Sequence, residues 1–394
     1  MSDTAAGTAT LLIVQRSLTQ YRVPFFEALC IALAARGVRL RLVVGDPTPA
    51  ERARGDEGVL SWAEHVACRY AMGGRLCWQD LRPCLGGVDY VVVAQENKLL
   101  FNWRLLLRPP ADLRVALWGH GRNFQAGGLE DGRTRGLSER FKCWLSRRAD
   151  WWFAYTELSA RSVRGFGYPA QRITTLNNAV DSAALRCKVA HCRAGDLAAL
   201  RRRLGLGSGR VGLFLGSLYR EKRLDLLLDA AQLVRASMPD FQLIIAGGGP
   251  EEQAVRRRAA GLDWVHPVGP VAGARKIEWL AIAEVLLVPG AVGLGLVESF
   301  AAGVPIVVCE GGGHGPELAY LESGVNGLLV PSTTQAYASA VLSLLQDPRL
   351  AQRLREGCLA AADIYTLEAM VTRFCDGVDA WRAAPRLQDS GPGG

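Results

Sequence analysis

The amino-acid sequence predicts an α/β protein of two domains, each built on a parallel sheet with helices on both faces. Short, almost continuous apolar segments alternate along the chain with longer helical or looped stretches, a pattern typical of buried parallel strands. The length of 394 residues suffices for two domains with a core each. Glycine-rich loops follow several of the apolar segments, where ligands usually meet a sheet of this kind.

The composition narrows the class of protein. A hydrophobic content of 49% and a charged content of 21% indicate a folded chain. The net charge of +8 suits phosphate-rich ligands, anionic membranes or nucleic acid without choosing among them. The ten cysteines form no C-x-x-C pairs or Cys/His clusters, so reduced thiols are expected. The longest apolar run, residues 285–297, is too short to cross a membrane, and no signal peptide is visible, which predicts a cytoplasmic protein.

The first domain is expected to span residues 1–182. Its apolar segments predict strands at residues 11–14, 38–44, 90–94, 114–118, 152–155 and 173–176. A helix between the first two strands begins near Pro24 and ends before Gly37. Residues 183–209 are polar and rich in arginine and are expected to connect the two domains.

The second domain is expected to span residues 210–365. Its apolar segments predict strands at residues 211–215, 242–246, 285–288, 306–309 and 327–330. A long amphipathic helix is predicted over residues 366–382. The tail, residues 384–394, is predicted to be disordered, as is the start of the chain.

Residues 285–309 carry the clearest functional signal. They predict a buried strand, a glycine-rich loop at residues 289–295, a short helix and a second buried strand. Such a unit presents free backbone N–H groups and a helix N-terminus, which bind phosphates. Glu298 is the one carboxylate in this apolar run. From its residue type alone, Glu298 could as well have a structural role, capping the helix or facing solvent, as a role in ligand binding.

Two other strand ends carry polar candidates. The segment LFLGSLYREKRLDLLLDA predicts a strand that ends at Gly216, a basic loop with Arg220 and Lys222, and a helix. Positive side chains before a helix suit a diphosphate. His120 directly follows a predicted strand between two glycines, although histidines at strand ends are more often structural. The segment IIAGGGPEE has Glu252 where a dinucleotide fingerprint needs glycine, which disfavours a dehydrogenase.

The pattern P-x-x-x-G-x-G-L-V-E-S-F-A-A-G-V-P at residues 289–305 resembles the donor-binding signature of GT-B glycosyltransferases of family GT4. The resemblance extends from about residue 10 to residue 380 and is most specific at residues 211–330. It implies a GT-B fold, in which two Rossmann-like domains face each other across a cleft and a C-terminal helix returns to the first domain. The first domain would serve the acceptor, and the second would bind a nucleotide-sugar donor.

The resemblance also implies roles for single residues. Lys222 would neutralise the leaving diphosphate, Glu298 would bind the ribose, and His120 would contact the donor sugar. Two positions depart from the family. Ser217 stands where the family has an arginine, with Arg220 as the candidate replacement. Gly290 stands where the family's first glutamate of an E-x7-E pair contacts donor-sugar hydroxyls. The implied donor site comprises Gly216, Ser217, Lys222, Val268, Lys276, Gly290, Leu294, Gly295, Glu298 and Glu317.

The function that the resemblance implies is retaining transfer of a sugar from a nucleoside-diphosphate sugar to a hydroxyl of a glycan, lipid-linked or natural-product acceptor. No metal and no cofactor beyond the nucleotide sugar are expected. The glycine at position 290 predicts a donor other than an ordinary hexose, or hydroxyl binding by backbone groups and residues 311–315. Two alternatives remain open. A nucleotide-sugar epimerase would consume donor without an acceptor, and an inert nucleotide-sugar-binding protein would turn nothing over.

Residues 134–148 predict an amphipathic helix with apolar Leu137, Phe141, Trp144 and Leu145 on one face among basic side chains. Most such helices pack on their own sheet. Peripheral contact with the inner face of a membrane is the second interpretation. No nucleic-acid partner is expected.

Overall fold

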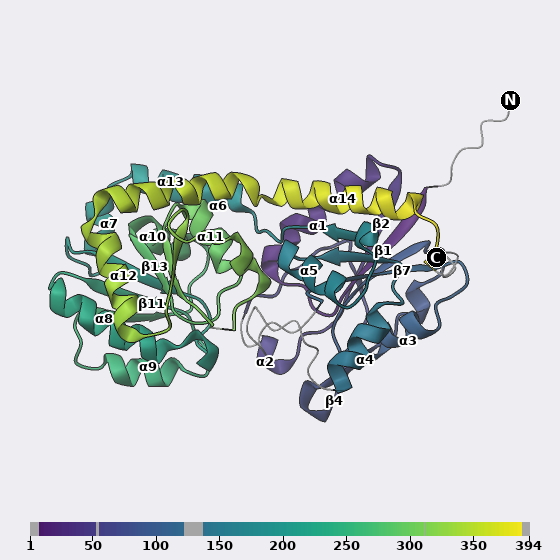
Figure 1. The fold of residues 1–394 in the computed structure, drawn as a ribbon, viewed down its shortest axis with the longest axis horizontal. Coiled ribbons are helices and arrows are strands. Elements are labelled where there is room, and N and C mark those ends of the chain that lie inside the picture. Colours follow the sequence, from purple (N-terminus) through teal and green to yellow (C-terminus); the bar gives the residue numbers. More distant parts are fainter. Residues whose placement is uncertain (1–7, 53–54, 122–136, 312, 388–394) are drawn as a thin grey trace. The chain divides into compact units, whose positions relative to one another are not determined.

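A computed structural model describes residues 8–52, 55–121, 137–311 and 313–387, which form two compact units (Figure 1). Of these, residues 8–178 and 368–387 belong to the first unit, and residues 179–367 to the second. The predictions of disorder at residues 1–7 and 388–394, and of helix at residues 134–136, lie outside the described residues.

The first unit contains a seven-stranded parallel sheet in the order β3-β2-β1-β6-β7-β8-β9. Its strands are β1 (Ala9–Gln15), β2 (Val38–Val44), β3 (Glu64–His65), β6 (Tyr90–Ala94), β7 (Arg114–Gly119), β8 (Trp151–Ala154) and β9 (Ile173–Thr175). Six of them were predicted to within two residues because most are short segments rich in apolar residues. The antiparallel hairpin of β4 (Cys68–Ala71) and β5 (Leu76–Gln79) was missed, since its side chains are only partly buried.

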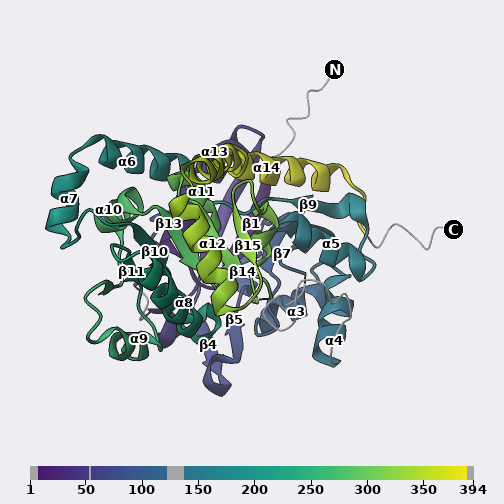
Figure 2. The ribbon, with the colours of Figure 1, turned by 60° about the vertical axis from the view of Figure 1, so that its left-hand side comes forward.

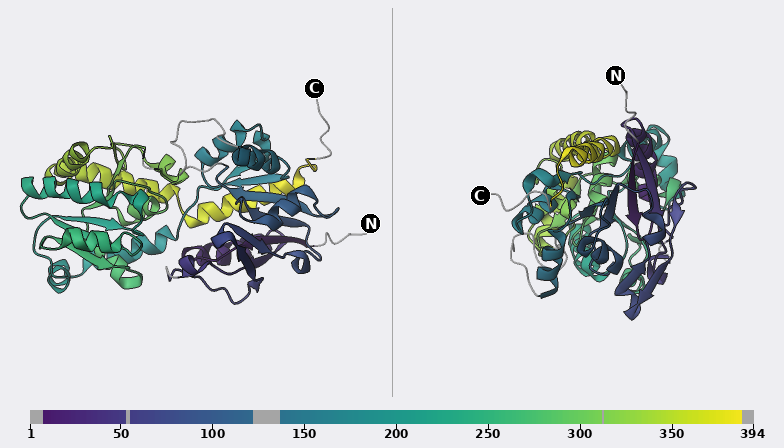
Figure 3. Two further views of the ribbon diagram at one scale, coloured as in Figure 1. Left: turned by 90° about the horizontal axis from the view of Figure 1, so that it is seen from below. Right: turned by 90° about the vertical axis from the view of Figure 1, so that its right-hand side faces the viewer.

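Helices follow the strands of the first sheet. They are α1 (Val23–Ala34), α2 (Pro49–Arg52), α3 (Leu100–Leu107), α4 (Leu137–Ser146) and α5 (Glu157–Gly165). The last helix, α14 (Leu367–Ala383), also packs on this sheet, as Figure 3 shows. The Phe374 ring stacks on the Phe153 ring at a centroid distance of 4.3 Å. The predicted return of the C-terminal helix to the first unit is therefore confirmed.

The chain that follows α14 is fixed by hydrogen bonds as far as Leu387. The Arg114 and Arg172 guanidinium groups donate to the carbonyl oxygens of Ala384 and Pro385, at 2.9 and 2.7 Å. The Leu387 N–H donates to Asp150 Oδ1 at 2.7 Å. The prediction of a disordered tail is wrong for residues 384–387, because charged side chains far away in sequence hold its backbone.

The second unit contains a six-stranded parallel sheet in the order β12-β11-β10-β13-β14-β15. Its strands are β10 (Val211–Leu215), β11 (Gln242–Ala246), β12 (Val265–Gly269), β13 (Val285–Val288), β14 (Ile306–Cys309) and β15 (Gly327–Val330). Five strands were predicted with the correct bounds. Strand β12 was missed because Pro267 and His266 interrupt its apolar pattern.

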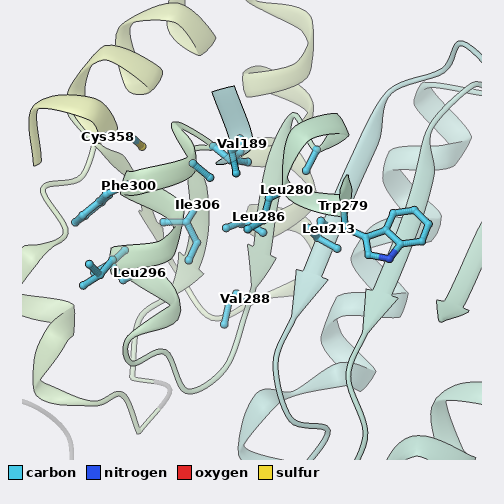
Figure 4. Close-up of a cluster of buried hydrophobic side chains, with 14 of the residues drawn as sticks. Val189, Leu213, Trp279, Leu280, Leu286, Val288, Leu296, Phe300, Ile306 and Cys358 are labelled. Carbon is cyan, nitrogen blue, oxygen red and sulfur yellow. The ribbon is translucent and has the colours of Figure 1, made fainter. Parts of the chain in front are cut away.

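Helices cover both faces of the second sheet, which has a hydrophobic cluster on each face. They are α6 (Ser182–Ala194), α7 (Leu197–Arg203), α8 (Leu224–Ser237), α9 (Glu252–Ala259), α10 (Gly273–Ile282), α11 (Gly295–Ala302), α12 (Thr334–Gln346) and α13 (Pro348–Ile364). Successive strand residues alternate between faces: Leu213 packs with α10 and α11, whereas Phe214 packs with α8 and α12. Figure 4 shows the first cluster, and Figure 2 shows α8 beside α12.

Residues 183–209 are part of the second unit. They form most of α6 and all of α7, and Val189 and Leu200 are buried in the same cluster as Leu213. The expectation of a separate connection is wrong because these helices carry enough apolar side chains on one face to join the core, despite their arginines.

Each sheet reverses its strand order at one place. In the first sheet, β1 lies between β2 and β6, and in the second, β10 lies between β11 and β13. The loops after β10 and β13 lead to α8 and α11, which cover opposite faces. Open α/β sheets bind ligands in the crevice that such a reversal leaves at the carboxyl ends of the strands. The topology therefore predicts that ligands bind at the loops after β1, β6, β10 and β13.

The first testable prediction concerns Asp150, which joins the C-terminal segment to the first sheet. Its carboxylate accepts hydrogen bonds from Arg114 Nε at 2.5 Å and from the Leu387 N–H, and lies 3.5 Å from Arg172 Nη1. These side chains are 6–11% exposed. Asp150→Ala leaves two buried arginines unpaired, so we expect a loss of about 3–5 kcal/mol in the free energy of unfolding, measured in urea.

Asp80 is the matched control, since its ion pair with Arg82 is largely exposed. Asp80→Ala should leave the urea midpoint nearly unchanged. An equal, small effect of both substitutions would show that Asp150 does not hold the C-terminal segment.

Candidate functional site

Three loops meet at the carboxyl edge of the second sheet, at its reversal between β10 and β13. They follow β10, β13 and β14 and comprise residues 216–223, 289–294 and 310–315, of which residue 312 lies outside the described part of the chain. The first loop includes a short 3₁₀ helix, Arg220–Lys222, and a second one, Pro316–Tyr320, follows the third loop. The middle loop holds the other two.

Ala291 and Val292 of the middle loop use all four of their backbone polar groups to bind the neighbouring loops. The Ala291 N–H donates to Glu221 O at 2.8 Å, and the Ala291 carbonyl accepts from Lys222 Nζ. The Val292 N–H donates to His314 Nδ1 at 3.3 Å, and the Val292 carbonyl accepts from the Gly315 N–H at 2.7 Å. These bonds fix the three loops as one surface.

Lys222 is the cation at the centre of this surface. Its ammonium group lies 5.3 Å from the centroid of the Tyr219 ring in addition to its bond with Ala291. Burial lowers the pKa of Lys222 to about 8, because the charged form loses hydration. An anion beside Lys222 would restore the favourable environment of the charge, so the site is suited to a phosphate group.

Gly290 is required by the close approach of the loop that carries Lys222. A Cβ at position 290 would lie 2.1 Å from Glu221 O and 2.4 Å from the Lys222 carbonyl carbon. No side chain fits there without displacement of the backbone. The missing glutamate is thus explained by geometry: the backbone of residues 221–222 occupies the space, and a glutamate introduced at position 290 has no room.

Glu298 and Lys276 form an ion pair, with Lys276 Nζ 2.5 Å from Glu298 Oε1. Glu298 lies in the first turn of α11, and Lys276 lies in α10. Their side chains are 20% and 26% exposed, so both remain accessible to a ligand. The resemblance to GT4 predicted both residues as donor-binding, and the structure brings them into contact.

The remaining predicted donor-site residues occupy the same edge of the second sheet. Gly216 has a φ of +151°, which favours glycine, and is followed by exposed Ser217 and Arg220. Glu317 is buried, with Oε2 3.8 Å from the position of a Cβ on Gly293. Val268 and Leu294 are half-buried against the hydrophobic cluster, and Gly295 begins α11 in open space.

His120 belongs to the first unit, where it follows β7. Its ring stacks on Tyr155 at a centroid distance of 4.2 Å. Burial lowers the pKa of His120 to about 4, with the positive charges of Lys142 and Arg22 adding to the effect. The imidazole is therefore neutral at physiological pH and can exchange hydrogen bonds with hydroxyls.

Gln95 and His314 were not predicted as site residues, but each holds a loop of its own unit in place by hydrogen bonds. The Gln95 amide pairs with the backbone of Gly121, beside His120, through two bonds of 3.0 Å. His314 accepts from Val292 and donates through Nε2 to Cys309 O at 2.8 Å. His314 stood in a glycine-rich loop and could have been chosen, whereas no sequence signal marked Gln95.

In the parts of the chain that the structure describes, no group of three or more His, Cys, Asp or Glu side chains is arranged to hold a metal ion. No helix within these ranges is both long and apolar enough to cross a bilayer.

Comparison with known proteins shows which family the region around this site resembles. Residues 209–347, which contain the three loops, match the family model described as Glycosyl transferases group 1. The resemblance to family GT4 predicted from the sequence motifs is thereby confirmed.

Particular relatives match about the same region. A D-inositol 3-phosphate glycosyltransferase from Thermobispora bispora is 28% identical over 246 residues, or 58% of this chain and 55% of the relative. A GDP-mannose-dependent alpha-(1-6)-phosphatidylinositol monomannoside mannosyltransferase from Mycolicibacterium smegmatis is 36% identical over 168 residues, or 39% and 43% of the two chains. The alignments thus span about half the length of these curated relatives.

Among solved structures, Anabaena HepE in complex with UDP superposes with a TM-score of 0.67 over 94% of this chain and 100% of that chain. The sequence identity is 16%, so the likeness establishes the fold alone. The prediction of a GT-B fold with two Rossmann-like units is confirmed.

The second testable prediction concerns His314. Burial lowers the pKa of His314 below the ordinary value of about 6.5, so the unfolded chain binds a proton at a higher pH than the folded chain does. The stability that neutral His314 provides is fully present above pH ~6.5 and declines as the pH falls towards the folded-state pKa, by at most ~1.4 kcal/mol per pH unit. His314→Asn should remove this part of the pH dependence in urea unfolding.

His191 provides the control, because its side chain is exposed on α6. His191→Asn should keep the wild-type pH dependence. A His314→Asn variant with the wild-type slope between pH 5 and 6.5 would contradict the role of His314 as a neutral bridge.

Proposed function

We propose that this protein is a glycosyltransferase that binds a nucleoside-diphosphate sugar at the three loops of the second unit and transfers the sugar to a hydroxyl group. The observation that carries this proposal is the placement of Lys222 at the reversal of the sheet, with Glu298 and Lys276 on the adjoining helices. This region lies within the segment that matches the family model. A phosphate ligand also suits the positive charge of the chain.

The protein's own groups account for departure of the diphosphate. Negative charge grows on the leaving diphosphate as the bond to the sugar breaks, and fixed positive groups in a partly buried site stabilise that charge. Lys222 supplies one such group, and exposed Arg220 is near enough in sequence to supply a second in place of the arginine that Ser217 replaces. Transfer would then need no metal. We propose that the transfer retains the configuration of the sugar, as the likeness to GT4 suggests.

Glu298 would orient the ribose through its hydroxyls, and Lys276 would hold the carboxylate in position. Gly216, Val268, Leu294 and Gly295 would complete the nucleotide site, with Glu317 nearer the sugar. Because position 290 has no side chain, the sugar hydroxyls would meet backbone groups and Glu317 instead of the family's first glutamate. His120, which is neutral and half-buried, would contact the donor sugar through hydrogen bonds, the role that the likeness to GT4 suggests.

We also propose that the first unit contacts anionic membrane lipids. Phe141 and Trp144 on α4 are 42% and 46% exposed, and the Arg148 guanidinium lies 4.4 Å from the Trp144 ring. Arg140 and Arg147 are exposed on the same segment. Leu145, which the sequence placed on this apolar face, is instead buried against the sheet. Exposed aromatic rings among arginines suit a lipid interface, and the acceptor would then be lipid-linked.

The third testable prediction concerns nucleotide binding by Lys222. Lys222→Met should weaken the binding of UDP or GDP at pH 7 by about 1.5–3 kcal/mol, because a charge-assisted hydrogen bond is lost. In the wild type, affinity should fall as the pH rises above about 8, where free Lys222 loses its proton. The variant should lack this decline. Isothermal titration calorimetry at pH 7 to 9.5 measures both effects.

Lys188 on α6 is an exposed lysine in the same unit, and Lys188→Met should bind both nucleotides as the wild type does. If Lys222→Met bound UDP and GDP with wild-type affinity, the proposed phosphate site would be contradicted. Transfer assays with sugar donors and hydroxyl acceptors, followed by mass spectrometry, then test the reaction itself.

The fourth testable prediction concerns the membrane surface. The wild type should sediment with vesicles of phosphatidylglycerol and phosphatidylcholine at low salt and less so at high salt. Phe141→Ala with Trp144→Ala should reduce sedimentation several-fold, since the interfacial aromatic rings are removed. Val59→Ser removes an apolar side chain that is 84% exposed elsewhere and should have no effect. Unchanged sedimentation of the double variant would contradict the proposal.

A further inference from the structure

A pocket of the first unit lies at the edge of the sheet where the strands begin. Arg114 at the start of β7 and Asp150 directly before β8 both line it. Open parallel sheets bind their substrates at the other edge, where the strands end, and His120 lies there after β7. The pocket is therefore separate from the donor site and from the position of His120.

The pocket combines apolar walls with positive charge. Six of its ten lining residues are apolar, among them Leu106, Leu113 and Leu387. The other four are three arginines and Asp150, whose carboxylate is neutralised by its ion pair with Arg114. A pocket of this kind suits an anion that carries an apolar group.

The size of the pocket limits which part of a ligand it can hold. Its volume is about 40 Å³. One water molecule needs about 10–15 Å³ on the same scale, so the pocket has room for roughly three water molecules or one phosphate group. Pro109 and Arg148 line the pocket and are exposed, so such a group can enter from solvent.

Arg148 joins the pocket to the exposed aromatic rings of α4. It lines the pocket, and its guanidinium carbon lies 4.4 Å from the centroid of the Trp144 ring. No carboxylate among the described residues pairs with Arg148, so its charge is available to an anion. Exposed tryptophan rings settle at the headgroup level of a bilayer. A cation that stacks on Trp144 then lies at the level of the lipid phosphates.

Further apolar side chains surround Trp144. The Phe141 ring lies 5.6 Å from the Trp144 ring and 5.4 Å from the Trp103 ring of α3. Helices α3 and α4 lie side by side (Figure 1), and Leu107 at the end of α3 is 43% exposed. Leu107 directly follows Leu106, which lines the pocket. An acyl chain can therefore lie on exposed apolar surface while its phosphate enters the pocket.

We propose that this pocket binds the phosphate group of an anionic phospholipid whose acyl chains lie along Leu107, Phe141 and Trp144. The inference rests on the proposed membrane contact and names the lipid group that the first unit recognises. Arg148 donates to the phosphate oxygens, and the apolar walls contact the groups next to the phosphate. The bound lipid is an anchor and not the acceptor, because the pocket lies at the other edge of the sheet from His120.

The test uses the full chain and dihexanoyl phosphatidylglycerol below its micellar concentration, with dissociation constants from isothermal titration calorimetry. Arg148→Gln should weaken binding about tenfold or more, because a charge-assisted hydrogen bond is lost. Leu387→Ser removes an apolar wall, keeps the backbone bond to Asp150, and should weaken binding about threefold or more. Arg161→Gln on α5 is the matched control, since this arginine is 71% exposed and should not affect binding.

The outcomes separate this inference from the proposed functions. Loss of lipid binding in Arg148→Gln, with an unchanged melting temperature, supports the pocket even where UDP does not bind or the Phe141→Ala, Trp144→Ala variant sediments normally. An equal loss in Arg147→Gln would overturn the pocket, because Arg147 is exposed nearby without lining it. So would a wild type that binds no dihexanoyl phosphatidylglycerol, or that binds glycerol 1-phosphate or dihexanoyl phosphatidylcholine as tightly.

Discussion

The candidate site depends on the hydrogen bonding of two consecutive peptide units, those of Ala291 and Val292. Their four backbone groups face neighbouring loops, so each loop keeps the next in place. Two of the four partners are backbone groups, which any residue except proline would keep, and the other two are the side chains of Lys222 and His314. The constraint also explains the residue types beside it: glycine at position 290 permits the approach, and a neutral histidine at position 314 completes the bonding.

Much of the fold could be predicted because burial on both faces of a parallel sheet leaves a plain sequence signal. The strands at residues 211–215 and 285–288 are unbroken apolar runs with the bounds that the structure gives. Strand β12 gave no such signal because its ladder tolerates Pro267 near a register shift. The order of strands, and hence the two reversals, is set by helices that pack over the sheet and cannot be obtained from any one segment.

The candidate site was partly predictable for a similar reason. The ends of parallel strands and the starts of the following helices are where ligands bind in such sheets, and these places can be predicted from the sequence. Three of the predicted residues lie there: Lys222, Glu298 and His120. The pairing of Lys276 with Glu298 and of Gln95 with Gly121 joins segments that are 22 and 26 residues apart. Such contacts arise from tertiary packing. The substitution at position 290 shows the same limit, since the sequence reveals the absent carboxylate and only the structure reveals what fills its place.

The membership of α14 in the first unit has a consequence for the order in which the protein folds. Phe374 and Trp381 are fully buried in the core of the first unit, although they lie within the last 25 residues of the chain. During synthesis, the first 178 residues emerge long before this helix does. The second unit, which ends at Leu367, has all of its own segments earlier and can complete its core while the first still exposes apolar surface. The half of the protein that is made first is thus the half that is finished last.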